Sequence, residues 1–246
     1  MTLSARDLKP IHITRWIGNR GWQGAHEYNA SRYAFRYFSW AVEQGILPKN
    51  PLAGMKRAKP MPRQRAITDG EYLAMLRATD SDFRRLLFAL RQTGARPGEL
   101  RELTWEQVRP DHLLPREHKT VAKVRKPRII HLTPCMQRFL AVLKKRSKSD
   151  YVFLNGRGRP WTSNAVRLRV ARLRDKLGLA DDVCAYLIRH AFGSNAILNG
   201  VDVATVAELM GHASTEVTTS VYIHLAEQKS HLQAAASLDS HAGGTG

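Results

Sequence analysis

Apolar residues recur at helical spacing in several stretches of the chain. The strongest stripe stands at positions i, i+3, i+4 and i+7 and consists of Phe83, Leu86, Leu87 and Leu90. Such a stripe is the buried face of an amphipathic helix, and Gly94 supplies its stop. A second helix is predicted to begin at Thr133-Pro134, and a third to end at Gly178. Thr68, three residues ahead of Glu71, forms a capping box that predicts a further helix start.

Extended segments between these helices are short. One lies near residues 113–114 and the next at 128–132, with a basic turn between them. Residues 151–154 read as a short strand or as an extended lead into a turn. Short strands among longer helices indicate a helical domain that carries a small sheet. We therefore predict a mainly α fold with a small antiparallel β-sheet, of the α+β class.

The first 55 residues also predict helices, but with few apolar positions. One stripe ends at Gly45 and consists of Tyr28, Phe35, Phe38, Ala41 and Val42. An earlier helix around Trp16 is expected to stop at Gly18. Two or three helices in so short a piece give a thin core, so we expect this piece to be marginal alone. The predicted organisation is a small helical domain, a linker, a larger domain and a tail, at 1–55, 56–66, 67–230 and 231–246.

The charge of the chain indicates what kind of partner it binds, which the rest of the composition does not. The 246 residues include 39 Lys or Arg against 21 Asp or Glu, a formal net charge of +18. Solubility does not require such an excess, which indicates a polyanionic partner, nucleic acid in the first place and an acidic membrane surface as the alternative. No run of about 18 apolar residues and no secretory signal is visible, so we expect neither a membrane span nor export.

Cysteine and histidine usage argues against stabilising metals and disulfides. The chain has 2 cysteines, Cys135 and Cys184, too few for a disulfide framework or a four-cysteine zinc site. Its 10 histidines are scattered without paired-ligand spacing. We expect no metal and no other cofactor, and a reducing, cytoplasmic setting.

The densest positive charge lies in the stretch 56–65, whose two prolines prevent a regular helix. An extended basic linker there would add salt-dependent affinity for a nucleic acid, although a merely solvated connector is the alternative. Two arginines four residues apart on one helix, two in a turn and one on a later helix extend the candidate binding set. The candidates are Arg32, Arg36, Lys56, Arg57, Lys59, Arg63, Arg65, Arg157, Arg159 and Arg167.

Separated polar residues remain as candidates for chemistry, because the P-loop, the Gly-x-Ser-x-Gly elbow and the His-Glu-x-x-His motif are all missing. Thr93-Gly94-Ala95-Arg96-Pro97-Gly98-Glu99-Leu100 places Arg96 directly after a helix stop, where Glu99 can orient its guanidinium. Later come Tyr186-Leu187-Ile188-Arg189-His190, then Gly211-His212, then Tyr222. Each of these alone is a weak signal.

Together, and in this order, these motifs resemble the tyrosine recombinase (phage integrase) family over about residues 65–230. The family has Arg in a Thr-Gly-x-Arg-x-x-Glu-Leu corner, Lys in a β-turn, His-x-x-Arg-His, Gly-His and a final Tyr. The matching positions here are Arg96, Lys119, Arg189, His212 and Tyr222. Lys123 and Lys126 are rival candidates for the lysine.

The resemblance implies a site-specific recombinase or integrase that cleaves and rejoins DNA through a 3′-phosphotyrosyl intermediate, without metal or ATP. It implies that Tyr222 is the nucleophile and that Arg96 and Arg189 neutralise the charge that grows on the phosphate. Lys119 would then protonate the leaving 5′ oxygen and His212 would hydrogen-bond the phosphate. Such chemistry needs arginine because its planar fork donates paired hydrogen bonds and keeps its proton.

Two departures from the family pattern bear on this expectation. Tyr186 stands where the family has the first His of His-x-x-Arg, and a phenol is a poor base at neutral pH. The family's core-binding domain normally has about four helices, whereas residues 1–55 resemble only its latter part, without a separate arm-binding domain ahead of them. We therefore expect a short, truncated core-binding domain before the catalytic domain. In the family, the tail packs onto a neighbouring protomer; a frayed end is the alternative here.

The resemblance also implies partners. These are double-stranded DNA, a homotetramer on that DNA with a monomeric or weakly associated free state, and accessory DNA-bending proteins, with no membrane. The chain would then be cytoplasmic and associated with the nucleoid. Two alternatives stay open: a catalytically impaired DNA-binding protein of the same fold, a regulatory remnant, and a type IB topoisomerase-like enzyme. The short chain and the integrase-like spacing from Gly211-His212 to Tyr222 argue against the latter.

Overall fold

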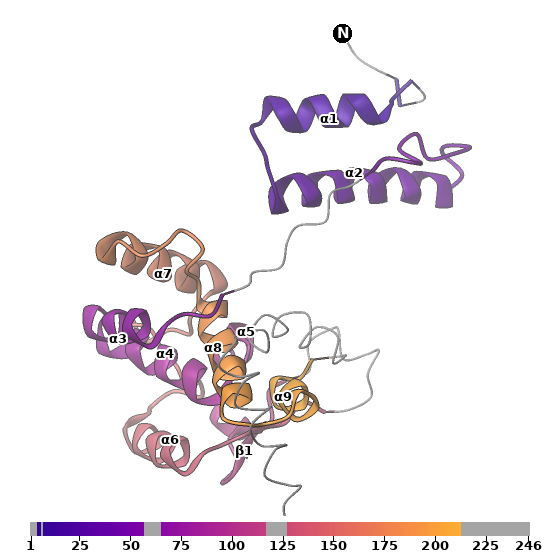
Figure 1. Ribbon diagram of the computed structural model, residues 1–246. Coiled ribbons are helices and arrows are strands. Elements are labelled where there is room, and N and C mark those ends of the chain that lie inside the picture. Colours follow the sequence, from indigo (N-terminus) through magenta and orange to yellow (C-terminus); the bar gives the residue numbers. More distant parts are fainter. Residues whose placement is uncertain (1–3, 6, 57–64, 117–126, 213–246) are drawn as a thin grey trace, which may run out of the picture. The chain divides into compact units, whose positions relative to one another are not determined.

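The chain divides into two compact units, Met1–Arg63 and Gln64–Gly246, each of which is described by itself. The structure is a computed structural model and describes residues 4–5, 7–56, 65–116 and 127–212 (Figure 1). The boundaries expected at residues 55, 66 and 230 stay predictions.

The N-terminal unit has two helices in its described part, α1 (Pro10–Asn19) and α2 (Ala25–Glu43). The expectation that Gly18 stops the first helix is wrong, because α1 continues through it and Gly21 supplies the left-handed turn with φ 64°. A glycine inside a helix costs only about 1 kcal/mol, so Gly18 is tolerated there. The second helix ends shortly before Gly45, where the sequence predicted its end. Few apolar residues are buried in this unit: Ile17, Ala41, Leu47 and Leu52.

The C-terminal unit is mostly helical. Its helices are α3 (Asp69–Ala78), α4 (Ser81–Thr93), α5 (Pro97–Arg101), α6 (Pro134–Arg146), α7 (Ser163–Leu177), α8 (Ala185–Leu198) and α9 (Val203–Met210), with a 3-10 turn η1 (Trp105–Gln107). Local sequence explains their ends. The Thr68 hydroxyl accepts from the Glu71 amide to cap α3, and Gly94, Gly178 and Gly211 adopt the left-handed conformation after α4, α7 and α9.

The sheet has two short antiparallel strands, β1 (His112–Leu113) and β2 (Ile130–His131). Leu113 pairs with Ile130 and both are buried, whereas His131 is exposed, as alternation along a strand requires. Residues 151–154 form only isolated bridges, so the extended lead was the better of the two interpretations. The prediction of a mainly α fold with a small antiparallel sheet is confirmed.

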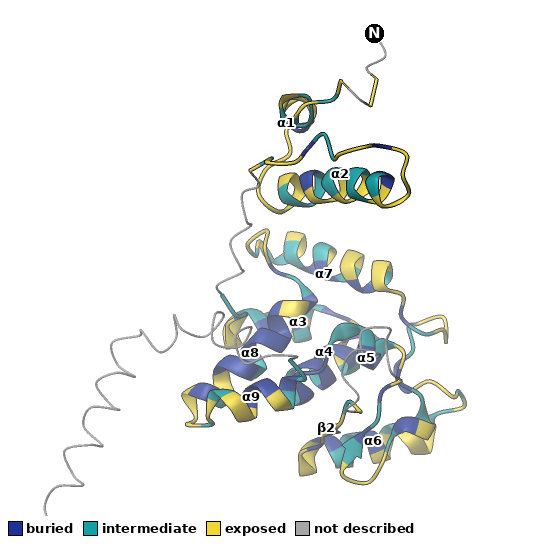
Figure 2. Ribbon diagram, turned by 90° about the vertical axis from the view of Figure 1, so that its right-hand side faces the viewer, coloured by how far each residue is buried: buried dark blue, intermediate teal, exposed yellow. Residues whose placement is uncertain are grey.

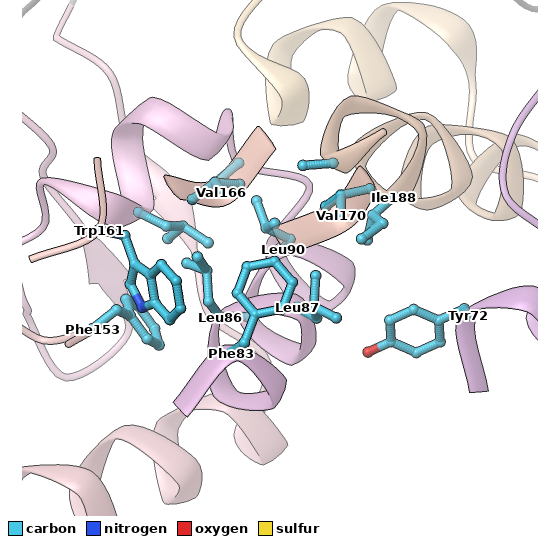
Figure 3. Packing of buried hydrophobic residues seen from close by; sticks show 14 of the residues in the cluster. Tyr72, Phe83, Leu86, Leu87, Leu90, Phe153, Trp161, Val166, Val170 and Ile188 are labelled. Carbon is cyan, nitrogen blue, oxygen red and sulfur yellow. The ribbon is translucent and has the colours of Figure 1, made fainter. Parts of the chain in front are cut away.

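The core of the C-terminal unit is built around α4 and α8, which pack against each other. Figure 2 shows both helices largely buried, and Figure 3 shows apolar side chains of α4, α7 and α8 meeting between the helices. The Phe83 and Trp161 rings lie 5.0 Å apart between their centroids. Each fully buried leucine stabilises the fold by about 1.5–3 kcal/mol. This core holds the end of α4 and the middle of α8 in fixed positions.

Gly94 is required where α4 meets α8. A Cβ atom there would lie 2.3 Å from the Phe192 ring of α8, and the residue has φ +60°. The close approach brings the backbone after α4 to within hydrogen-bonding reach of Arg189 on α8.

In the described part of the chain, no helix is both long and apolar enough to span a bilayer.

Candidate active site

Arg96 stands at the N-terminal end of α5, directly after the corner formed by Gly94 and Ala95. Its backbone amide and its Nη1 atom donate to the two oxygens of Glu99, at 2.7 Å and 2.9 Å. Glu99 is buried, whereas the Arg96 side chain is 42% exposed. The local sequence Arg-Pro-Gly-Glu therefore holds the guanidinium in place and leaves part of it accessible.

Arg189 lies in the middle of α8 and is fully buried. Its Nη1 atom donates to the Gly94 carbonyl at 2.7 Å, and its Nη2 atom donates to the Met210 carbonyl at 2.5 Å. Burial, and next the charge of Arg96, lower the pKa of the guanidinium to about 10. It remains protonated near neutral pH, so the fold carries a charge that water does not stabilise.

The end of α9 brings these two arginines together. Arg96 Nη2 donates to the Gly211 carbonyl at 2.6 Å, next to the Met210 carbonyl that Arg189 binds. His212 follows directly, and its amide donates to the Ala207 carbonyl at 2.9 Å. Three segments far apart in the sequence, after α4, in α8 and after α9, thus meet at one place.

His212 is half-buried beside this cluster. Desolvation, followed by the charges of Arg189 and Arg96, lowers the pKa of its imidazole to about 4. The imidazole is therefore neutral near physiological pH and can accept as well as donate a hydrogen bond.

Tyr186 lies against the same arginine from within α8. The centroid of its ring is 5.9 Å from Arg189 Cζ, and the ring meets His190 edge-on, with centroids 4.7 Å apart. Tyr186 is 37% exposed as a residue, so part of it is accessible. The residue that replaces the family's histidine thus lies beside Arg189, as its spacing in the helix suggested.

Arg128 belongs to the cluster as well, although no motif in the sequence pointed to it. Its side chain is 11% exposed, and its Nε atom lies 3.5 Å from Glu99 Oε1. A signal was present, because Arg128 stands at the same alternate spacing as Ile130 and Leu132, which are buried in and next to β2. Arg96 and Arg128 therefore both contact the carboxylate of Glu99, and that carboxylate also acts through its charge on Arg189. The excess positive charge makes this place suited to an anion.

Several predicted residues fall outside the described part of the chain. These are Lys119 with its rivals Lys123 and Lys126, the nucleophile candidate Tyr222, and the linker cations Arg57, Lys59 and Arg63. Their roles stay predictions. The described residues also include no group of three His, Cys, Asp or Glu side chains that could hold a metal ion.

The candidate DNA-binding arginines of the C-terminal unit differ in their partners. Arg157 and Arg159 are exposed in the turn after residue 154, and Arg167 is exposed on α7 with a 2.9 Å hydrogen bond to Asn164. Arg65, by contrast, donates to both oxygens of Asp182 and of Glu71 at 2.9–3.1 Å. These contacts indicate that Arg65 ties the start of α3 to the segment before α8.

In the N-terminal unit, Lys56 and Arg32 are exposed, and Arg32 lies over the rings of Tyr28 and Tyr33. Arg36 forms a 2.8 Å ion pair with Glu43 along α2, with both side chains largely exposed. Such an exposed pair contributes little to stability, so Arg36 can exchange this partner for a phosphate.

Comparisons with known proteins show the family and the fold of the chain. The sequence profile of the phage integrase family matches residues 65–229. The tyrosine recombinase XerC of Actinobacillus pleuropneumoniae serotype 7 (strain AP76) is 29% identical over 226 residues, which are 86% of this chain and 72% of that protein.

Solved structures show the same fold. The Tn1549 transposon integrase in complex with transposon right end DNA has a TM-score of 0.69 at 18% identity and covers 90% of this chain and 82% of its own. A lambda integrase dimer bound to a COC′ core site has a TM-score of 0.70 at 18% identity. That match covers 87% of this chain and 64% of the lambda integrase chain. The chain therefore belongs to the phage integrase family, the tyrosine recombinases.

Proposed function

We propose that this chain is a site-specific DNA recombinase that cleaves and rejoins strands through a 3′-phosphotyrosyl intermediate on Tyr222. The observation that carries the proposal is the meeting of Arg96 and Arg189 on the consecutive carbonyls of Met210 and Gly211, next to His212. Two guanidinium groups at one positively charged place, where Arg96 is partly exposed, suit a phosphodiester, which carries one negative charge and gains more in the transition state.

The two arginines would stabilise the transition state with the N–H groups that do not already donate hydrogen bonds within the protein. A guanidinium carries five N–H groups, and each of these two uses some of them on backbone or carboxylate oxygens. Arg189 Nε has no hydrogen-bond partner among the residues that the structure describes. The remaining donors would bind the non-bridging oxygens, and the existing bonds hold the forks in position before substrate arrives.

His212, Tyr186, Lys119 and Tyr222 complete the proposed reaction. The Tyr222 oxygen attacks phosphorus as its phenolic proton passes to His212, whose imidazole is neutral in the free protein. The DNA 5′ oxygen leaves with a proton from Lys119, which forms the phosphotyrosine and a free 5′ hydroxyl. The protonated His212 then donates a hydrogen bond to the phosphate. Tyr186 is a hydrogen-bond donor beside Arg189 rather than a base.

Double-stranded DNA is the proposed partner, and strand exchange would take place in a homotetramer on that DNA with accessory bending proteins. We place the chain in the cytoplasm, on the nucleoid. The net charge of +18 supports this partner. The exposed Arg157 and Arg159 belong to the proposed DNA surface, together with Arg32, Arg36, Lys56 and Arg167.

Covalent capture on randomised DNA tests the proposal and requires no chosen target sequence. The protein is mixed with short nicked duplexes that have a randomised centre, and DNA that stays attached in SDS is recovered and sequenced. A nick lets the short cleaved strand diffuse away, so the phosphotyrosyl adduct accumulates. We expect wild type and Tyr151→Phe to capture related sequences and Tyr222→Phe to capture none.

Each of the other possible results would support a different function or a different nucleophile. Binding without capture by wild type would favour the catalytically impaired DNA-binding protein. Capture and relaxation of supercoiled DNA without any sequence preference would favour the topoisomerase. Capture by Tyr222→Phe would show that another residue is the nucleophile.

A further inference from the structure

Arg128 is a largely buried cation next to a strand. It stands two residues before Ile130, the first residue of β2, and its side chain is 11% exposed. Burial lowers the pKa of its guanidinium. Burying a charge is unfavourable unless specific contacts compensate for it. Its contacts therefore decide what this arginine does.

Those contacts join three segments. Nη1 donates to the carbonyl of Ile129 at 2.9 Å and, more weakly, to the carbonyl of Glu208 in the last turn of α9 at 3.4 Å. Nε lies 3.5 Å from Glu99 Oε1, the oxygen that also accepts from Arg96. Arg128 thus links the strand β2 to the end of α9 and to the carboxylate that orients Arg96.

Gly211 packs directly on this guanidinium. A Cβ atom at Gly211 would lie 2.7 Å from Arg128 Nε and 2.9 Å from both Cδ and Cζ. Gly211 also has φ +65°, so two separate reasons exclude a side chain there. The backbone turn that presents His212 therefore lies directly against the Arg128 side chain.

We propose that Arg128 is a positioning residue for DNA cleavage, which sets the Gly211–His212 turn and the Glu99 carboxylate against β2. The proposal rests on the proposed function, and it concerns a residue outside the set of five matched to the family motifs. Arg128 acts through two neighbours. It packs against the backbone of the Gly211–His212 turn, and it contacts the Glu99 carboxylate that also binds Arg96. Among the described residues its Nη2 atom has no hydrogen-bond partner, so its contacts with the turn are mainly those of packing and charge.

Loss of Arg128 should therefore slow cleavage more than it weakens binding. Arg96 and Arg189 remain, so the phosphate keeps its direct cationic partners, but Arg96 and His212 lose their fixed positions. A displacement of about 1 Å at a reacting centre can cost about 100-fold in rate. We expect a comparable fall in the single-turnover rate of adduct formation for Arg128→Met, with the Kd for the captured duplex changed by less than about 3-fold.

Two variants make this result specific. Arg109→Met is the matched control, because Arg109 is exposed, precedes β1 and donates to the Glu106 carbonyl outside the cluster. It should keep both rate and affinity. Arg128→Lys keeps the charge without the planar face and should recover part of the rate that Arg128→Met loses.

Hydrogen exchange tests the positioning claim apart from catalysis. The amides of Gly211 and His212 donate to the carbonyls of Glu208 and Ala207, both at 2.9 Å. We expect these amides to exchange faster in Arg128→Met and at the wild-type rate in Arg109→Met. If Arg128→Met does not fold, Gly211→Ala is the second variant, because its Cβ would collide with the Arg128 side chain. It is expected to make the same amides exchange faster and to slow cleavage.

Unchanged exchange in Arg128→Met would overturn the proposal whatever the cleavage rate, and so would an unchanged rate with faster exchange. An equal loss of rate and affinity would assign Arg128 to substrate binding and overturn it as well. Failure of the proposed function is a separate result, namely a wild-type protein that captures no DNA.

Discussion

The Arg96 guanidinium donates a 2.6 Å hydrogen bond to the Gly211 carbonyl, across 115 positions of sequence. The bond joins the corner after α4 to the end of α9, and Arg189 joins the neighbouring carbonyl to the same corner through Gly94. The two arginines that would neutralise the phosphate therefore also hold together the backbone around it. Because the two roles belong to the same two side chains, mutations at these sites change stability and chemistry together, to different degrees.

Arg189 and Arg96 should differ in what their loss does to stability. Arg189→Met removes a fully buried cation and leaves the Gly94 and Met210 carbonyls without that partner. We expect the free energy of unfolding to fall by about 3 kcal/mol. Arg96 is 42% exposed, so Arg96→Met should lower it by only about 1 kcal/mol. Urea denaturation measures both, and equal losses would contradict the difference in burial.

Gly94→Ala should destabilise the C-terminal unit more than Gly178→Ala does. The two glycines have φ +60° and +61°, so the cost of placing alanine in the left-handed region is the same. A Cβ at Gly94 would in addition meet the Phe192 ring at 2.3 Å, whereas nothing lies within 4 Å at Gly178. We expect a loss of about 1 kcal/mol at Gly178 and a loss at Gly94 that is larger by about 1–3 kcal/mol. Similar melting temperatures for the two variants would contradict this close approach.

Acid should destabilise the protein partly through His212. In the folded state its pKa is lowered from 6.5 to about 4, so as pH falls the unfolded chain takes up the proton first. The contribution of His212 to stability is therefore complete above pH 6.5 and is lost as pH falls from 6.5 toward 4. Urea denaturation over this window should show a shallower decline for His212→Asn than for wild type. Equal slopes would contradict the lowered pKa.

Arg65 and Arg157 should differ in their effect on DNA binding, although both were predicted to contact DNA. Arg65 is bonded to two carboxylates of its own chain, whereas Arg157 is exposed in a turn. Arg157→Gln should reduce the slope of log affinity against log salt by about 1, because one phosphate contact is lost. Arg65→Gln should leave that slope unchanged and lower the melting temperature. A slope reduced equally by both would place Arg65 on the DNA as well.

The helices of the C-terminal unit could be predicted because their signals are local. The Thr68 to Glu71 capping box and the glycines at 94 and 178 act within a few residues, and the structure has the helix ends where these residues stand. Gly18 misled the prediction because a glycine inside a helix is only weakly unfavourable. The helix ends at Asn19, and the left-handed residue that follows its end is Gly21, with φ 64°.

The candidate site divides in the same way. The contact of Arg96 with Glu99 is local and could be inferred from Arg-Pro-Gly-Glu, and the spacing of Tyr186 and Arg189 follows from one helix turn. Arg128 could not be assigned, because its significance depends on Gly211, which reaches it only after α8 and α9 have packed. Alternation with Ile130 could have predicted its burial but not its neighbours.

The burial of Arg189 has a practical consequence for handling the free protein. Its described hydrogen bonds go to neutral backbone carbonyls, so a small oxyanion bound at the partly exposed Arg96 beside it would stabilise the folded domain. Buffers with sulfate or phosphate should thus raise the melting temperature while they compete with DNA, and the conditions best for storage or crystallisation will be the worst for activity.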